Sequence, residues 1–142
     1  MSLWKQSSDV DAVNRWSERT AAQSLGILVT EIGADYVRGT MPVDERTRQP
    51  FGLLHGGASV LLAETLGSLA ANLCLDPQQE VAVGLDINAN HLRAVTAGQV
   101  TGTARPIHVG RTTQVWEIRI VTDKNELCCI SRLTMAVVPR RQ

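Results

Sequence analysis

The sequence has no excess of either charge and few cysteines, and both absences narrow its function. Fourteen basic residues balance fourteen acidic ones among 142 residues, which excludes the charge excess that drives nonspecific binding to nucleic acid or to an anionic membrane. The three cysteines, Cys74, Cys128 and Cys129, are odd in number and lack the Cys/His spacing of a metal site. We therefore expect no bound metal, and reduced core thiols in a cytoplasmic protein.

Long apolar runs and several familiar catalytic motifs are also missing. No segment approaches the ~20 apolar residues of a membrane span, and residues 1–10 lack the apolar region and cleavage site of a secretion signal. The absence of GxGxxG, P-loop, GxSxG and HExxH motifs argues against dinucleotide enzymes, NTPases, serine hydrolases of that type and zincins. With no repeat and no linker, we expect one soluble domain over residues 1–142 that binds neither membrane nor nucleic acid.

Hydrophobic patterning, composition and segment length predict two helices and six strands. A short helix, capped by Ser8 or Asp9, is expected from Val10 to about Arg19, and a long apolar helix over residues 56–75. The expected strands cover residues 25–32, 36–43, 81–88, 98–109, 112–122 and 127–138.

The order of these elements indicates the fold class. Consecutive strands joined by short turns imply an antiparallel sheet, and the long apolar helix needs such a surface to pack against. Val13 and Trp16 share one face of the short helix. One face of strand 112–122 carries Gln114, Trp116, Ile118 and Ile120. The sequence therefore predicts an α+β domain, with one long helix against an antiparallel sheet of about six strands.

Glu64 is the most informative residue, because it is the only charged side chain between His55 and Asp76 in the long apolar segment. Burial of an unpaired carboxylate costs on the order of several kcal/mol, so Glu64 should be partnered, protonated or lining a cavity. The alternative is a helix face that meets solvent. Ser68 lies one turn further on the same face, whereas Thr65 should point elsewhere.

The second feature is His55-Gly56-Gly57, where the long helix begins. Glycine lets a ligand approach the backbone, and the first N–H groups of a helix have no internal partner, so they can bind an anion or a developing oxyanion. Ordinary turns also use Gly-Gly, so the spacing to Glu64 matters. Gly56 and Glu64 lie about 12 Å apart along one helical face, which leaves room for a substrate if the chain bends at Gly56.

Further polar residues lie near this helix start in the sequence. Gln49 and His55 flank the loop at residues 50–52, and His91 closes a strand, where it is either a ligand contact or a solvated strand end. Near a later turn lie Arg105, His108, Gly110 and Arg111. The basic residues among them are either solvated turn charges or a site for the phosphates of a nucleotide-bearing ligand.

These motifs resemble a known family. The segment MPVD at residues 41–44, QPFGLLHGGAS at 49–59, Ala63-Glu64, and GLDINANH at 84–91 are similar to the hotdog-fold acyl-CoA thioesterases. The similarity runs over almost the whole chain. It is greatest to the phenylacetyl-CoA thioesterase-like bacterial branch, which includes enzymes for 1,4-dihydroxy-2-naphthoyl-CoA in menaquinone biosynthesis and for proofreading in enterobactin synthesis. The hotdog fold, a long helix wrapped by an antiparallel sheet, agrees with the elements expected above.

The resemblance implies a role for each candidate residue. Glu64 would be the catalytic carboxylate, as nucleophile or as general base on water, and the Gly56 N–H would stabilise the charge that develops on the thioester oxygen. His55 would help to bind the thioester and its leaving thiolate, while Gln49 and Ser68 would position the thioester and the water. The CoA arm would lie towards His91, Arg105, His108, Gly110 and Arg111. No cofactor is implied, because coenzyme A is part of the substrate.

The resemblance also implies an assembly. Two subunits would join their sheets edge to edge as a homodimer, with Gln49 and His55 of one chain facing Glu64 of the other, and dimers would pair into a homotetramer. An unprotected sheet edge, and more apolar strand surface than one helix can cover, support this indirectly.

The leading hypothesis is hydrolysis of an acyl-CoA to a free acid and CoA. The expected acyl group is aromatic or hydroxyaromatic, with medium-chain fatty acyl groups as further substrates of a promiscuous enzyme, and an acyl carrier protein could replace CoA. The alternatives are a hotdog-fold hydratase or dehydratase and a non-catalytic acyl-CoA-binding protein. Apolar composition alone does not distinguish one acyl group from another.

Overall fold

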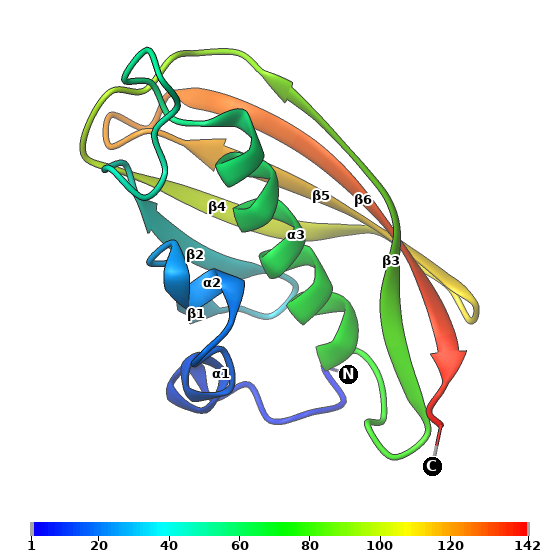
Figure 1. Cartoon of the computed structure of the whole chain (residues 1–142). Coiled ribbons are helices and arrows are strands. Elements are labelled where there is room, and N and C mark those ends of the chain that lie inside the picture. Colours follow the sequence, from blue (N-terminus) through cyan, green and yellow to red (C-terminus); the bar gives the residue numbers. More distant parts are fainter. Residues whose placement is uncertain (1, 142) are drawn as a thin grey trace.

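The computed structural model describes residues 2–141 and shows an antiparallel six-stranded sheet curved around one long helix (Figure 1). In chain order the elements are α1 (Val10–Trp16), α2 (Ala21–Ser24), β1 (Leu28–Ile32), β2 (Val37–Pro42), α3 (Gly56–Leu73), β3 (Glu80–His91), β4 (Gln99–Val109), β5 (Thr113–Val121) and β6 (Leu127–Pro139). The predicted α+β class, the long helix and the number of strands are confirmed.

The strand order across the sheet is β1-β2-β4-β5-β6-β3. Every neighbouring pair is antiparallel, as expected. Pairing between consecutive strands fails at β3, however, which pairs with β6 and not with β4, its successor in the chain. The reason is that β4 occupies the free edge of β2, so β3 takes the opposite edge of the sheet, on the other side of α3 (Figure 1).

The core lies between α3 and the sheet. The four residues predicted to share a face of β5 are all fully buried: Gln114, Trp116, Ile118 and Ile120. Trp116 donates its indole N–H to the Gln114 amide oxygen at 2.8 Å, and the Gln114 amide donates to the Ala71 carbonyl near the end of α3 at 3.3 Å. Both polar groups are therefore satisfied inside the core.

The N-terminal region departs most from the expected elements. The first helix ends at Trp16 rather than near Arg19, and α2 with Gly26, whose φ is +75°, delays the first strand from residue 25 to Leu28. The expectation that Val13 and Trp16 share a packed face is wrong for Trp16, which is 73% exposed while Val13 is buried. The long helix ends at Leu73, two residues early, where the Lys5 and Gln6 N–H groups donate to the Leu73 carbonyl.

Both outer strands are bound by an asparagine side chain. Asn14 of α1 pairs with the N–H and carbonyl of Val29 in β1, both at 2.9 Å. Asn72 of α3 pairs in the same way with Ala82 in β3, at 2.9 and 3.2 Å. Each amide takes the place of a neighbouring strand at one residue only, so most of the β3 edge is uncovered.

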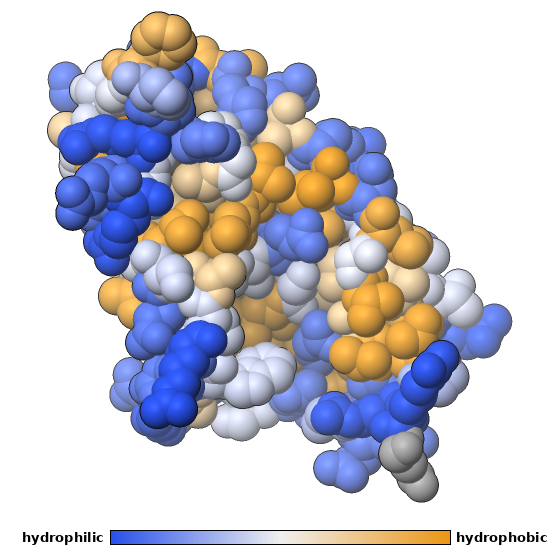
Figure 2. All heavy atoms as spheres, in the orientation of Figure 1, coloured by the Kyte–Doolittle hydropathy of each residue, from blue (hydrophilic) through white to orange (hydrophobic). Residues whose placement is uncertain are grey.

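The uncovered edge of β3 carries apolar side chains. Val83 is 44% and Leu85 is 62% exposed, and Figure 2 shows hydrophobic residues gathered along this side of the molecule. The expected unprotected edge with excess apolar strand surface is thus confirmed. Within residues 2–141, no helix is both long and apolar enough to cross a membrane.

The cysteines are buried thiols, as predicted, and none forms a disulfide bond. Burial raises the pKa of Cys74 and of Cys129 to about 11. Both thiols are therefore protonated at neutral pH.

Candidate active site

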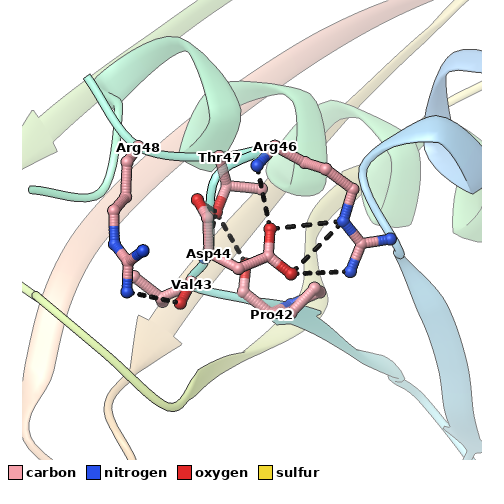
Figure 3. A network of polar contacts seen from close by, with 6 residues as sticks. All are labelled: Pro42, Val43, Asp44, Arg46, Thr47 and Arg48. Carbon is pink, nitrogen blue, oxygen red and sulfur yellow. Dashed lines mark hydrogen bonds and ion pairs between the residues drawn. The ribbon is translucent and has the colours of Figure 1, made fainter. Parts of the chain in front are cut away.

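The loop between β2 and α3 is held by side-chain contacts to its own backbone (Figure 3). The buried Thr47 hydroxyl donates to the Pro42 carbonyl at 2.8 Å and accepts from the Asp44 N–H at 3.1 Å. The Arg46 guanidinium lies 2.7 Å from the Asp44 carboxylate, and this hydrogen bond lowers the pKa of that carboxyl. The loop is therefore a rigid support for the residues that follow it.

Gln49 braces the next turn of this loop. Its side-chain oxygen accepts from the Phe51 N–H at 2.5 Å and from the Leu53 N–H at 3.2 Å. Its backbone N–H donates to the Leu53 carbonyl at 2.8 Å. Because the amide oxygen is engaged inside the loop, the amide NH₂ is the part of Gln49 that can donate to a ligand.

His55 begins α3 as its N-cap. Its backbone N–H donates to the Thr47 carbonyl at 2.7 Å, and its Nδ1 accepts from the Gly57 N–H at 2.8 Å. A ring nitrogen that accepts carries no proton, so neutral His55 is a donor at Nε2. Among the hydrogen bonds formed within residues 2–141, the Gly56 N–H has no acceptor, which leaves it available to a ligand.

Gly56 lies against His91, the last residue of β3. A methyl group on Gly56 would lie 2.9 Å from His91 Nε2, closer than such atoms normally approach. The two residues line a cleft of about 410 Å³, which we call the helix-start cleft. Its other lining residues are Gln49, Leu53, Leu54, Ser59, Leu92, Arg93, Ala94 and Cys128. Sequence reasoning missed Ser59, Arg93 and Cys128, although Arg93 lies only two positions after His91.

Glu64 lines a second and larger hollow of about 790 Å³, the α1–α3 groove, which is visible beside α3 in Figure 2. Ser68 lines it as predicted, whereas the expectation that Thr65 points elsewhere is wrong. The groove is wide enough to be lined by both Glu64 and its neighbour Thr65. Its lining residues are Asn14, Trp16, Ser17, Thr20, Ala21, Ala22, Ile27, Val29, Gly57, Val60, Leu61, Glu64, Thr65, Ser68, Leu69 and Asn72.

Glu64 lines a cavity wall, which is one of the three environments expected for it. The side chain is half-buried, and within residues 2–141 it forms no ion pair. Its Oε2 lies close to β3, because a methyl group added to Gly84 would be 3.1 Å away. Ser68 donates a long hydrogen bond to the Met135 sulfur at 3.8 Å.

Within the described residues 2–141, the helix-start cleft and the α1–α3 groove share no lining residue. Placing Gly56 and Glu64 on one helical face was wrong. Residues seven apart, such as Gly57 and Glu64, share a face, but an eighth residue adds about 100° of rotation. In one chain, the Gly56 N–H and the Glu64 carboxylate therefore open into different hollows.

The basic residues lie at the opposite end of α3 from the helix-start cleft. The β4–β5 turn with Gly110 and Arg111 adjoins Gln114, which contacts Ala71 near the end of α3 (Figure 1). Arg105 pairs with Asp35 at 3.3 Å and stacks over the Tyr36 ring at 4.6 Å. His108 and Arg111 are exposed. Within one chain, none of the four predicted turn residues lines the same hollow as His91.

Comparison with known proteins identifies the family. Residues 51–129 match the model of the thioesterase superfamily. The chain is 50% identical over 136 residues to 1,4-dihydroxy-2-naphthoyl-CoA hydrolase of Escherichia coli, covering 96% of this chain and 99% of the relative. It is likewise 50% identical over 136 residues to the proofreading thioesterase EntH of Cronobacter sakazakii, covering 96% and 98%.

A solved structure of a relative shows the same fold. A crystal structure of a thioesterase from Haemophilus influenzae is 53% identical, superposes with a TM-score of 0.94, and matches 96% of this chain and 95% of that one. The sheet wrapped around a long helix that starts at His-Gly-Gly is thus the hotdog fold. The chain belongs to the thioesterase superfamily and is a thioester hydrolase.

Proposed function

We propose that the protein hydrolyses acyl-CoA thioesters at a site assembled from two subunits. The observation that carries this proposal is the separation of the helix-start cleft from the α1–α3 groove. Hydrolysis needs donors at the thioester oxygen and a carboxylate near the carbonyl carbon, and one chain holds these groups in two separate hollows. A second copy of the chain brings Glu64 of the partner subunit to the cleft.

The free edge of β3 supports this assembly. Two β3 strands paired antiparallel about a twofold axis would set the His91 end of one strand opposite the Glu80 end of the other. That pairing would cover the exposed Val83 and Leu85. It would also bring the partner's β4–β5 turn, with Arg111 of the partner subunit, towards the helix-start cleft, where it could meet the phosphates of CoA. Pairs of such dimers would form the proposed homotetramer.

In the proposed reaction the thioester carbonyl accepts from the free Gly56 N–H at the start of α3, where the helix dipole adds to the stabilisation of the oxyanion. The Gln49 amide NH₂ and His55 Nε2–H donate to the thioester and to the leaving sulfur. The Glu64 carboxylate either takes the proton of an attacking water, which Ser68 helps to position, or attacks the carbonyl carbon itself. In the first case the C–S bond breaks as water adds, and the proton that Glu64 took from the water passes to the CoA thiolate. In the second case the C–S bond breaks to leave an anhydride between the acyl group and Glu64. Water then hydrolyses this anhydride, which releases the acid and restores Glu64, and one proton of the water goes to the CoA thiolate.

The α1–α3 groove supports an aromatic or hydroxyaromatic acyl group, with medium-chain fatty acyl groups as further substrates. Its walls combine apolar side chains with the hydroxyls of Ser17, Thr20, Thr65 and Ser68. The related enzyme of Escherichia coli is named for a hydroxylated aromatic acyl-CoA. The acyl group of 1,4-dihydroxy-2-naphthoyl-CoA fits a groove with such walls. Hydrolysis of this substrate would place the enzyme in menaquinone biosynthesis.

The test is release of free thiol from a panel of benzoyl-, 4-hydroxybenzoyl-, phenylacetyl-, 1,4-dihydroxy-2-naphthoyl-, hexanoyl- and lauroyl-CoA. Glu64→Gln should lower kcat at least ~100-fold on every substrate that is turned over, because it removes the base or nucleophile. Its melting temperature should stay unchanged, since Glu64 forms no ion pair within residues 2–141.

Glu45→Gln, on the exposed loop before α3, is the matched control and should be fully active. A Glu64→Gln enzyme within a few-fold of native kcat would contradict the proposal.

A further inference from the structure

We infer that Trp16 is the specificity-determining wall of the acyl subsite and selects flat aromatic acyl groups over alkyl chains. The inference rests on the proposed function, because it takes Glu64 as the group that marks the reacting end of the α1–α3 groove. Trp16 and Glu64 line that same groove, Trp16 from α1 and Glu64 from α3.

The Trp16 side chain lies outside the packed core. Val13, on the same short helix, is 7% exposed and packs in the core together with the partly buried Val10, whereas Trp16 is 73% exposed. A large aromatic side chain left open beside a concave surface is typical of a binding site rather than of a folding core. Among the residues of 2–141 that line the groove, Trp16 is the only aromatic one.

The helix that carries Trp16 is held in place. Asn14 pairs with the N–H and carbonyl of Val29, and the Asp9 carboxylate caps the helix start by accepting from the Asp11 N–H at 3.0 Å. Val29 also lines the groove. The α1 backbone that carries the indole is therefore held at a defined position relative to the groove wall, which is the support that a binding surface requires.

The chemistry of the groove suits a substituted aromatic ring. Its volume of about 790 Å³ lies within the range of small-molecule pockets. Offset stacking of two aromatic rings contributes interaction free energy beyond that of the apolar area they bury. An alkyl chain against the indole gains only the free energy of buried apolar area. Ser17 and Thr20 line the same groove as Trp16. The Thr20 hydroxyl donates to the Ser17 carbonyl and can accept a hydrogen bond from a ring substituent, while the Ser17 hydroxyl can donate or accept. Loss of the indole should therefore weaken aromatic substrates selectively.

The experiment compares kcat/KM for the best aromatic and the best straight-chain acyl-CoA in three variants. Trp16→Ala should lower kcat/KM for the aromatic ester by about 3- to 10-fold and that for the alkyl ester less than about twofold. Trp16→Phe, which keeps a ring, should restore most of the preference. Arg15→Ala is the control, since Arg15 is an exposed neighbour on α1 that does not line the groove.

An aromatic-to-alkyl ratio unchanged by Trp16→Ala overturns the inference, whether both activities persist or both fall. Absence of turnover on every aromatic ester overturns it as well. Failure of the proposed function has a different signature, namely a Glu64→Gln enzyme that keeps its activity. If Glu64→Gln is inactive and Trp16→Ala keeps the native ratio, only the role of Trp16 is wrong.

Discussion

The helix-start cleft and the α1–α3 groove lie along the same helix but are built in contrasting ways. The cleft is framed by backbone and side-chain donors that the preceding loop holds in place, with Thr47, Gln49 and His55 each making two or more hydrogen bonds. The groove is larger and mostly apolar, and its carboxylate has no ion pair within residues 2–141. The helix-start cleft therefore has a fixed geometry, whereas the α1–α3 groove provides a large space beside one carboxylate, that of Glu64.

This difference matches a division of labour in thioester hydrolysis. Stabilisation of an oxyanion requires donors that do not reorganise during the reaction, and in the proposed reaction the rigid cleft at the helix N-terminus would provide them. An acyl subsite that accepts several substrates needs an open apolar surface instead. Because the two regions have separate linings in one chain, the proposed reaction joins them through a second subunit, and damage to either region should have a distinct effect.

The largest effect in the cleft is expected from Gly56→Ala. The new methyl group would lie 2.9 Å from His91 Nε2, so the ring must move and the approach to the Gly56 N–H narrows. We expect kcat to fall about tenfold or more, as for a partly lost oxyanion donor. Steady-state thiol release measures this, with circular dichroism to confirm the fold. A folded variant with native kcat would remove Gly56 from the site.

Thr47→Val should act on the cleft indirectly, through its supporting loop. The substitution leaves the Pro42 carbonyl and the Asp44 N–H without the Thr47 hydroxyl, which should lower the free energy of unfolding by about 1–3 kcal/mol. KM should rise several-fold. The ratio of kcat for aromatic esters to kcat for alkyl esters should stay at its native value. Thr47→Ser retains the hydroxyl and should recover both stability and KM. Equal losses in the Ser and Val variants would show that the hydroxyl does not support the cleft.

Cys128→Ala should have the smallest effect, although Cys128 lines the cleft. Burial raises the pKa of this thiol, and its S–H donates to the Ile120 carbonyl at 3.3 Å, so it is protonated and engaged at neutral pH. We expect kcat within about twofold of native for a residue outside the chemistry. A loss comparable to that of Glu64→Gln would instead make Cys128 a nucleophile.

Local periodicity was sufficient to predict most of the fold. The alternation of residues in 112–122 predicts the buried face of β5. The apolar composition and length of residues 56–75 predict α3, which ends two residues earlier, at Leu73. The edge position of β3 was not predictable in this way, because it depends on which strand first occupies the free side of β2. The short α2 also escaped, since four residues carry too little periodicity to distinguish a helical turn from the start of a strand.

The candidate site was predicted in part. A lone carboxylate in an apolar helix indicated that Glu64 is partnered, protonated or lining a cavity, and the structure shows it lining a cavity. Two features of the site depend on contacts between distant parts of the chain, which the spacing of residues in the sequence does not reveal. Arg105 pairs with Asp35, seventy positions away in the chain, and so lies apart from the cleft. The division of Gly56 and Glu64 between two hollows depends on the loop, β3 and α1, which close around different sides of α3.

The assembly of the site from two subunits is tested most directly by complementation. One variant carries Gln49→Ala and Gly56→Ala, the other carries Glu64→Gln, and each is inactive or nearly so alone. In a mixed dimer, one of the two shared sites contains only native residues, so a 1:1 mixture refolded together should regain about a quarter of native activity by random pairing. Activity no higher than the mean of the two variants would show that each chain holds a complete site, contradicting the account.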